Sequence, residues 1–259
     1  MPQNQALGKY DLAGRVALIT GAGVGIGRAS ALALAEAGAT IGVHYHSSAA
    51  EAEETLRLVN EQGAQGVLLQ ADLADEAQAN AVVDRLAAEA GRIDILLNNA
   101  GSPLQRSKLE QCPTELWRRA LDVNVTSAFL VTRRAIPHLR AGGHGSIINN
   151  LSLSVQTGGA GGAGPYAAAK GALQVMTRTL ARELAPAVRV NAIMPGVIET
   201  RHHEVFSSAD QMLEYRKQTP LARNGQADEV AQVVLFLASD AASFLTGALV
   251  DINGGRFLR

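Results

Sequence analysis

The segment RVALITGAGVGIG (residues 15–27) decides the fold. Its first six residues form a short apolar run, which is typical of a strand buried inside a parallel sheet. Residues 25–38 then carry Ala, Leu and Ile at helical spacing and stop at Gly38. Glycine between strand and helix lets the backbone approach a phosphate closely, and the helix start presents free N–H groups at its positive dipole end. The segment therefore predicts a strand, a turn able to bind a dinucleotide, and a helix.

The same alternation continues along the chain. Strand-like runs recur at 39–45, 66–72, 92–101, 145–152, 188–196 and 247–254, and helix-like runs lie between them at 49–63, 75–90, 114–141, 164–185 and 226–239. Within 114–141 we expect Pro137 to bend or end the regular helix. Strands that alternate with helices of this length predict an α/β fold, with a parallel sheet covered by helices on both faces. We expect one domain over residues 1–259, with a polar leader at 1–13.

Composition excludes several classes of protein. The net charge is −1 and the basic residues form no run, which argues against nucleic-acid binding. The single cysteine, Cys112, excludes an internal disulfide and a cysteine-rich metal site. The N-terminus lacks the apolar segment of a secretory signal, and no run reaches the length of a membrane span. We therefore expect a cytoplasmic protein that binds neither membrane nor nucleic acid.

The glycine turn departs from one common dinucleotide motif and fits another. Ile26 stands where G-x-G-x-x-G needs its last glycine, whereas T-G-x-x-x-G-x-G fits at Thr20, Gly21, Gly25 and Gly27. The simpler alternative is a tight turn without a ligand. The glycine turn comes directly after the first strand, and this position favours dinucleotide binding over a turn without a ligand.

A second motif suggests proton transfer. In LSLSVQTGGAGGAGPYAAAK (151–170), Tyr166 and Lys170 are four residues apart, so they share one face of a helix. A tyrosine titrates near pH ~10, and a nearby cation stabilises the phenolate and lowers its pKa. The pair can therefore act as a general acid/base. A Tyr and a Lys at this spacing also occur together without function, so the pair needs its context.

That context is a set of motifs in a fixed order. They are TGAGVGIG (20–27), Asp72 after the third strand, NNAG (98–101), Asn124, Ser152, YAAAK (166–170) and PGVIET (195–200). From about Gly14 to Gly255 the chain resembles the short-chain dehydrogenases/reductases, including sugar or polyol dehydrogenases and 3-oxoacyl-acyl-carrier-protein reductases. The resemblance implies a Rossmann-like, doubly wound sheet of seven parallel strands. It also implies an NAD(P)-dependent oxidoreductase acting on CH–OH groups and forming a homodimer or homotetramer.

The resemblance also assigns residues to roles. It implies a catalytic set of Asn124, Ser152, Tyr166 and Lys170, with no metal. It implies a cofactor site of Gly21, Gly25, Ile26, Gly27, Tyr45, His46, Ser47, Asp72, Leu73, Asn99, Ala100, Gly101, Tyr166, Lys170, Pro195, Gly196, Ile198 and Thr200. Asp72 has an alternative role as the N-cap of the next helix. Residues 200–219 are expected to cover the substrate, which would contact Ser152, Ser154, Tyr166 and His202. Polar groups in this region favour a sugar, polyol or keto acid, and the alternatives are a 3-oxoacyl thioester or a cofactor-binding protein without turnover.

The catalytic serine requires a choice. Counting back thirteen residues from Tyr166, the commonest interval in the family, reaches Leu153, which has no hydroxyl. Counting forward along GSIINNLS (145–152) reaches Ser152 at the end of the strand. A loop absorbs an extra residue at little cost, whereas a slip in a strand turns its side chains to the wrong faces. We therefore assign Ser152 as catalytic and place Ser154 beside it in the pocket.

The expected cofactor is NADP(H), with NAD(H) as the alternative. An acidic residue at the end of the second strand would bind the adenosine ribose and repel a 2′-phosphate. Here that position falls in VHYHS (43–47), and the first acidic residue afterwards is Glu51. His46 with Ser47 can hydrogen-bond either a hydroxyl or a phosphate, and a protonated His46 favours phosphate.

Overall fold

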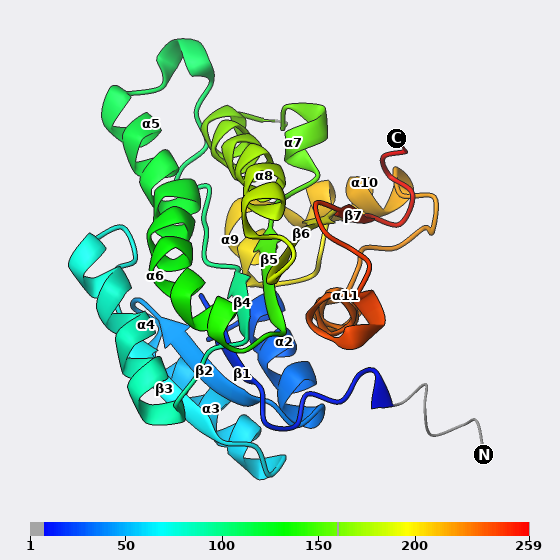
Figure 1. Cartoon of the computed structure of the whole chain (residues 1–259). Helices are drawn as coiled ribbons and strands as arrows, with labels where there is room; N and C mark the ends of the chain where they lie inside the picture. Colours follow the sequence, from blue (N-terminus) through cyan, green and yellow to red (C-terminus); the bar gives the residue numbers. More distant parts are fainter. Residues whose placement is uncertain (1–7, 160, 259) are drawn as a thin grey trace.

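Seven strands form one parallel sheet, as the alternation predicted. The computed structural model describes residues 8–159 and 161–258. The strands are β1 (Val16–Ile19), β2 (Thr40–Tyr45), β3 (Gly66–Gln70), β4 (Ile95–Asn98), β5 (Gly145–Asn150), β6 (Val188–Pro195) and β7 (Leu249–Ile252). Their order across the sheet is β3-β2-β1-β4-β5-β6-β7 (Figure 1). Because β1 pairs with β2 on one side and β4 on the other, the chain reverses its direction of winding there. Doubly wound sheets bind ligands at this point, outside the carboxyl ends of the strands.

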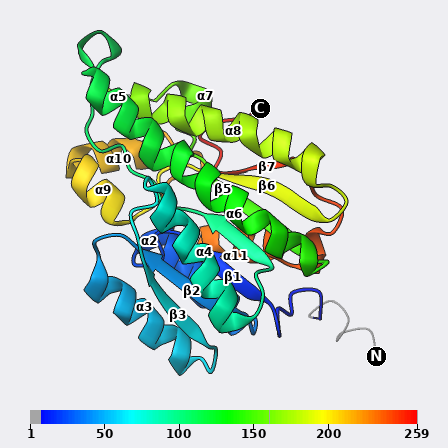
Figure 2. The same cartoon turned by 60° about the vertical axis from the view of Figure 1, so that its left-hand side comes forward.

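Helices cover both faces of the sheet. They are α2 (Gly25–Glu36), α3 (Ala49–Glu61), α4 (Glu76–Ala90), α5 (Thr114–Leu121), α6 (Ser127–Ala141), α7 (Ser154–Thr157), α8 (Gly164–Leu184), α9 (Arg201–Phe206), α10 (Ala209–Lys217) and α11 (Ala227–Ala238). One face carries α2, α3 and α11, and the other carries α4, α6 and α8 (Figure 2). The short helices α7, α9 and α10 follow the carboxyl ends of β5 and β6.

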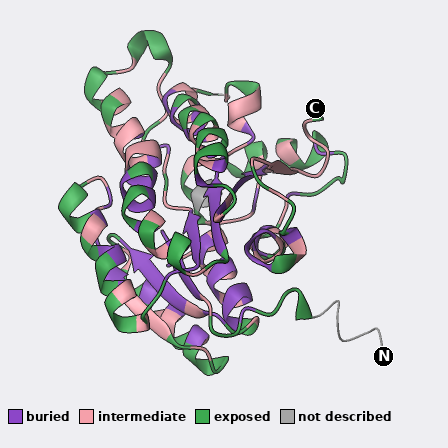
Figure 3. Cartoon of the chain, viewed as in Figure 1, coloured by how far each residue is buried: buried purple, intermediate pink, exposed green. Residues whose placement is uncertain are grey.

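Alternate strand residues build the core on the two faces. In β1, Ala17 and Ile19 pack against α2 and α11, whereas Val16 and Leu18 pack against α4 and α6. The five inner strands are accordingly buried, the edge strands β3 and β7 are largely half-buried, and the outer helix faces are exposed (Figure 3). Burial on both faces explains why the strands read as continuous apolar runs rather than as alternating ones.

One expectation needs correction. Pro137 does not end the 114–141 helix, because it lies inside α6, which continues to Ala141. The interruption is a π-helical turn at Asp122–Thr126. There the Asn124 side chain donates to the Ala120 carbonyl, and such an insertion into the backbone ladder is a common cause of a break. The polar segment 200–219 contains two helices, α9 and α10.

Candidate active site

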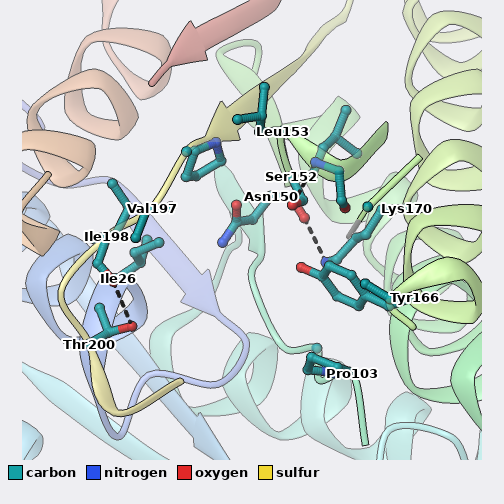
Figure 4. A pocket seen from close by; sticks show the side chains of 18 of the residues that line it. Ile26, Pro103, Asn150, Ser152, Leu153, Tyr166, Lys170, Val197, Ile198 and Thr200 are labelled. Carbon is teal, nitrogen blue, oxygen red and sulfur yellow. Dashed lines mark hydrogen bonds between the residues drawn. The ribbon is translucent and has the colours of Figure 1, made fainter. Parts of the chain in front are cut away.

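A cavity of about 530 Å³ lies at the carboxyl ends of the central strands. Its lining comes from the loops after β1, β4, β5, β6 and β7 and from the start of α8 (Figure 4). Fourteen residues expected in the site line it: Gly21, Gly25, Ile26, Asn99, Ala100, Gly101, Ser152, Ser154, Tyr166, Lys170, Pro195, Gly196, Ile198 and Thr200. Parallel strands bring these segments together because their carboxyl ends share one edge of the sheet.

The glycine turn after β1 is shaped for close approach. Gly21 and Gly25 have φ of +66° and +56°, a region that favours glycine. A Cβ on Gly27 would lie 2.1 Å from the Gly21 carbonyl oxygen, so only glycine lets α2 start this close to the turn. The N-cap residue of α2, Val24, makes no side-chain cap hydrogen bond, and Gly25 and Ile26 at the start of this helix line the cavity. These features fit the pyrophosphate of a dinucleotide.

The turn is tied to the neighbouring strand ends by side-chain amides. Asn99 Nδ2 donates to the carbonyl oxygens of Thr20 (2.9 Å) and Gly21 (3.0 Å). Asn99 Oδ1 in turn accepts from Asn150 Nδ2 at 2.9 Å. The Asn150 carbonyl oxygen accepts from Lys170 Nζ at 2.7 Å. Asn150, which the sequence analysis did not single out, therefore connects the turn to Lys170.

His44 is a second residue that the sequence analysis missed. It is buried on β2, where the Gly21 N–H donates to its Nδ1 at 3.1 Å and its Nε2 lies 3.2 Å from the Ala71 carbonyl oxygen. Since Nδ1 accepts and a carbonyl cannot donate, Nε2 carries the proton. Burial lowers the pKa of His44 from its ordinary 6.5 to about 4, so the ring is neutral. The available signal was a lone polar residue inside the apolar strand IGVHY.

Tyr166 and Lys170 lie on one face of α8, as their spacing predicted. Burial raises the pKa of Tyr166 to about 12, although a hydrogen bond with Ser152 acts in the opposite direction. Burial also lowers the pKa of Lys170 to about 8. The expected lowering of the tyrosine pKa by the lysine is not found. Lys170 Nζ lies 5.8 Å from the centre of the Tyr166 ring and donates to the Asn150 carbonyl, so desolvation dominates.

Both serines of the segment 151–170 line the cavity. Ser152 lies two residues after the end of β5, and its Oγ accepts the Ser154 N–H at 3.1 Å. Ser154 is the first residue of α7, and its Oγ is buried without a hydrogen-bond partner among the described residues. Of these two serines, Ser152 is the one that is hydrogen-bonded to Tyr166 in the part of the chain that the structure describes.

Asn124 lies behind the cavity rather than in its lining. It is fully buried, with Oδ1 accepting from the Ser102 N–H (3.0 Å) and Nδ2 donating to the Ser102 carbonyl (2.8 Å). A Cβ on Gly101 would lie 2.6 Å from Asn124 Oδ1 and 3.0 Å from Lys170 Nζ. The backbone of Gly101 therefore lies between Asn124 and the lysine.

The residues expected around the adenosine lie outside this cavity, at the ends of β2 and β3. His46 and Ser47 are exposed, whereas Tyr45 and Leu73 are buried in the core. The carboxylate of Asp72 accepts from the Ala74 N–H and from Arg119 Nη2. Although burial acts to raise the pKa of Asp72, these two donors hold it below its usual range.

Two further assignments have a different outcome. Asp72 is not the N-cap of α4, because Asp75 takes that position and accepts from the Gln78 N–H. The side chain of His202 lies outside the described residues. Among the residues whose side chains are described, no group of three His, Cys, Asp or Glu could hold a metal ion. The described helices include none long and apolar enough to cross a membrane.

Comparison with known proteins agrees with this geometry. The family model described as enoyl-(acyl carrier protein) reductase matches residues 21–256. The chain belongs to the short-chain dehydrogenase/reductase family. An uncharacterised oxidoreductase of Methylorubrum extorquens is 38% identical over 247 residues, covering 94% of this chain and 98% of the relative.

Solved structures of this short-chain dehydrogenase/reductase family share the fold. A gluconate 5-dehydrogenase from Burkholderia cenocepacia, in complex with NADP and tartrate, has a TM-score of 0.90 at 35% identity and covers 97% of this chain and 98% of its own. An NADH-dependent reductase responsible for alginate metabolism has a TM-score of 0.88 at 33% identity, with coverages of 96% and 100%. The protein is therefore an oxidoreductase of the Rossmann-like fold that uses a nicotinamide cofactor.

Proposed function

We propose that this enzyme transfers a hydride between NAD(P)(H) and a carbonyl/secondary alcohol pair, or an aldehyde/hemiacetal pair, with Tyr166 as general acid/base. One observation carries the proposal. The hydrogen-bonded Tyr166 and Ser152 hydroxyls lie in the same cavity as the glycine turn and the start of α2. A cofactor-binding protein without turnover has no need of this pair.

The chain's own residues would divide the proton chemistry as follows. A pKa of about 12 keeps Tyr166 a protonated phenol at neutral pH, the form that donates a proton during carbonyl reduction. Ser152 would donate a hydrogen bond to the substrate oxygen as negative charge develops there. Lys170 would position the ribose of the cofactor, and it would accept the proton from Tyr166 or return it. Asn124 would maintain the path by which this proton passes between Lys170 and solvent.

The cofactor would lie along the cavity and extend past it to the ends of β2 and β3. Gly21, Gly25 and the α2 N-terminus would hold the pyrophosphate, and Ile198 and Thr200 would hold the carboxamide. The bound nicotinamide supplies or accepts the hydride. We favour NADP(H) over NAD(H), because the end of β2 has no acidic residue and His46 is exposed there. Measuring KM for NADPH and NADH tests this, and an NADH preference above about tenfold, or ~1.4 kcal/mol, would contradict it.

The substrate we favour is a small polar molecule, a sugar, polyol or keto acid. The name of the Burkholderia enzyme, a gluconate 5-dehydrogenase solved with tartrate, supports this class. A 3-oxoacyl-thioester reductase is the second candidate, and the description of the matching family model, which refers to an acyl carrier protein, favours it.

We also infer a homodimer or homotetramer. Phe129 on α6 and Val175 on α8 are 45% and 63% exposed. These helices lie side by side in both views (Figures 1 and 2). Exposed apolar side chains on adjacent helices support an interface between subunits.

The Tyr166→Phe variant tests the proposed reaction. It removes the acidic hydroxyl and keeps the ring, so turnover of every ketone in a panel of sugars, keto acids and a 3-oxoacyl thioester should fall by at least about 10²-fold. Binding of NADP⁺, measured by calorimetry, should stay close to wild type. Retained turnover in Tyr166→Phe would show that another group transfers the proton.

A further inference from the structure

Arg256 enters the candidate active site from a distant part of the chain. It follows β7, the edge strand, and lines the same cavity as Ser152 and Tyr166. Its guanidinium carbon lies 4.5 Å from the centre of the Tyr215 ring, and its Nη2 donates to Gln218 Oε1 at 2.9 Å. These contacts, both with the region of α10, hold the guanidinium in one place.

One terminal nitrogen of this arginine, Nη1, needs an acceptor. Arg256 Nη1 is buried and has no hydrogen-bond partner among the described residues. A buried cationic donor without an acceptor is unfavourable, and a ligand that supplies an anionic acceptor removes this cost. The cavity therefore presents an oriented, charged donor from its α10 side.

The other charges around the cavity have the same sign. Arg106 and Arg201 also line it, whereas the described part of the lining includes no Asp or Glu. Arg201 is paired with Glu51 at 2.6 Å, so part of its charge is neutralised at the rim. A concave site lined by one sign of charge attracts ligands of the opposite sign.

The position of Arg256 points to the substrate rather than to the phosphates of the cofactor. β7 lies at one edge of the sheet, and β2 and β3 lie at the other. Figure 1 shows the C-terminal stretch beside α10 and β7, away from the ends of β2 and β3. The glycine turn and the N-terminus of α2 lie between these two edges of the sheet. They already supply N–H donors for the pyrophosphate.

We propose that the substrate carries a carboxylate a few bonds away from the carbonyl or carbinol carbon, and that Arg256 binds this carboxylate through Nη1. The inference rests on the proposed function and narrows its substrate class to oxo acids and hydroxy acids. One buried guanidinium nitrogen that lacks a partner among the described residues matches a singly charged carboxylate better than a phosphate monoester, which carries close to two charges at neutral pH. Tyr166 and Ser152, which line the same cavity, would act on the oxygen at the other end of the molecule.

Matched pairs of ketones test the proposal. We would measure kcat/KM with NADPH and NADH for 4-oxocyclohexanecarboxylate and 3-oxobutanoate, each beside its methyl ester. Wild type should prefer each acid to its ester by about 10- to 100-fold, the range expected for one charge-assisted hydrogen bond. Equal use of acid and ester would overturn the proposal, and so would preferential use of dihydroxyacetone phosphate.

Variants assign the preference to Arg256. In Arg256→Met the acids should lose their higher kcat/KM relative to the esters, chiefly because their KM rises, while turnover of the esters is retained. Arg256→Lys should keep part of it, because the charge remains but the geometry is lost. Arg85→Met is the matched control, since Arg85 is exposed on α4 outside the cavity lining. A parallel loss of acid and ester turnover in Arg256→Met would mean that the arginine only supports the fold.

A binding measurement separates this inference from the proposed reaction. Calorimetry would follow 4-oxocyclohexanecarboxylate and its methyl ester binding to protein saturated with NADP⁺ or NAD⁺, where no hydride is available. Binding of the acid that is lost in Arg256→Met supports the carboxylate site even without turnover. If that binding occurs but no ketone is reduced, the proposed function fails and the carboxylate site stands. If 4-oxocyclohexanecarboxylate binds no better than its methyl ester, the carboxylate site fails, whatever the enzyme reduces.

Discussion

At Tyr166 two local effects oppose one another. Burial raises the pKa of the phenol to about 12, and the hydrogen bond with Ser152 acts to lower it. The i, i+4 spacing predicts that Tyr166 and Lys170 share a face, but not which effect dominates their pKa values. Desolvation depends on everything that packs around the pair, including β5 and the Asn150 carbonyl, which lie elsewhere in the sequence.

Ser152 and Ser154 give a prediction at the same scale. Ser152→Ala removes a hydroxyl that is hydrogen-bonded to Tyr166, so kcat should fall by about 10²-fold, as for a lost donor in an oxyanion site. Ser154→Ala leaves the Ser154 N–H bond to Ser152 in place and should mainly change KM. Steady-state kinetics of both variants on one substrate would show which serine is catalytic. A larger loss of kcat in Ser154→Ala than in Ser152→Ala would reverse the assignment of Ser152.

Among the elements, the junction of β1 and α2 depends most on glycine. A Cβ on Gly27 would meet the Gly21 carbonyl oxygen at 2.1 Å and Asn99 Nδ2 at 2.7 Å. A Cβ on Gly23 would have its nearest neighbour at 3.5 Å, an ordinary contact. Gly27→Ala should therefore push α2 away from the turn, cost about 1–3 kcal/mol of stability and weaken NADP⁺ binding about tenfold or more.

Gly23→Ala is the matched control for that prediction. Its melting temperature and its NADP⁺ affinity should both stay close to wild type. Thermal unfolding and calorimetry of the two variants provide the comparison. Equal behaviour of Gly27→Ala and Gly23→Ala would mean that the turn tolerates a side chain at both positions.

His44 connects three elements, the turn after β1, β2 and the end of β3. Its pKa is about 4 in the folded protein against 6.5 ordinarily, so between these values the unfolded chain binds the proton more readily. Stability from this group is therefore fully present above about pH 6.5 and is lost as pH falls toward 4. The loss amounts to about 3 kcal/mol.

The His44→Asn variant tests this coupling. Asn keeps an acceptor near the Gly21 N–H but does not titrate, so the variant should lose less stability than wild type between pH 7 and pH 4.5. Urea unfolding at both pH values measures the difference, and His144→Asn, at a side chain 57% exposed, is the control. If His44→Asn had the same pH dependence of stability as wild type, protonation of His44 would not destabilise the folded protein.

At the scale of the whole molecule, α6 and α8 present the apolar surface that we assign to a subunit interface. Phe129→Glu and Val175→Glu each place a charge on it, and either should lower the mass measured by light scattering toward that of a smaller assembly. Leu213→Glu, at an exposed leucine of α10, is the control and should leave the mass unchanged. A monomeric wild type, or an assembly that both variants leave intact, would contradict the assignment.

The sequence by itself determined the order of strands and helices, the glycine turn and the shared helix face of Tyr166 and Lys170. These follow from short-range rules, because apolar runs, helical spacing and backbone freedom depend on near neighbours. Only the tertiary structure decided that Asn150 bridges the turn and Lys170, that His44 is buried and neutral, and that Arg256 reaches the cavity from the far end of the chain. Their partners are brought close by the parallel pairing of the sheet, and burial there sets the pKa values. Neither the contacts nor the loss of solvent can be read from spacing along the chain.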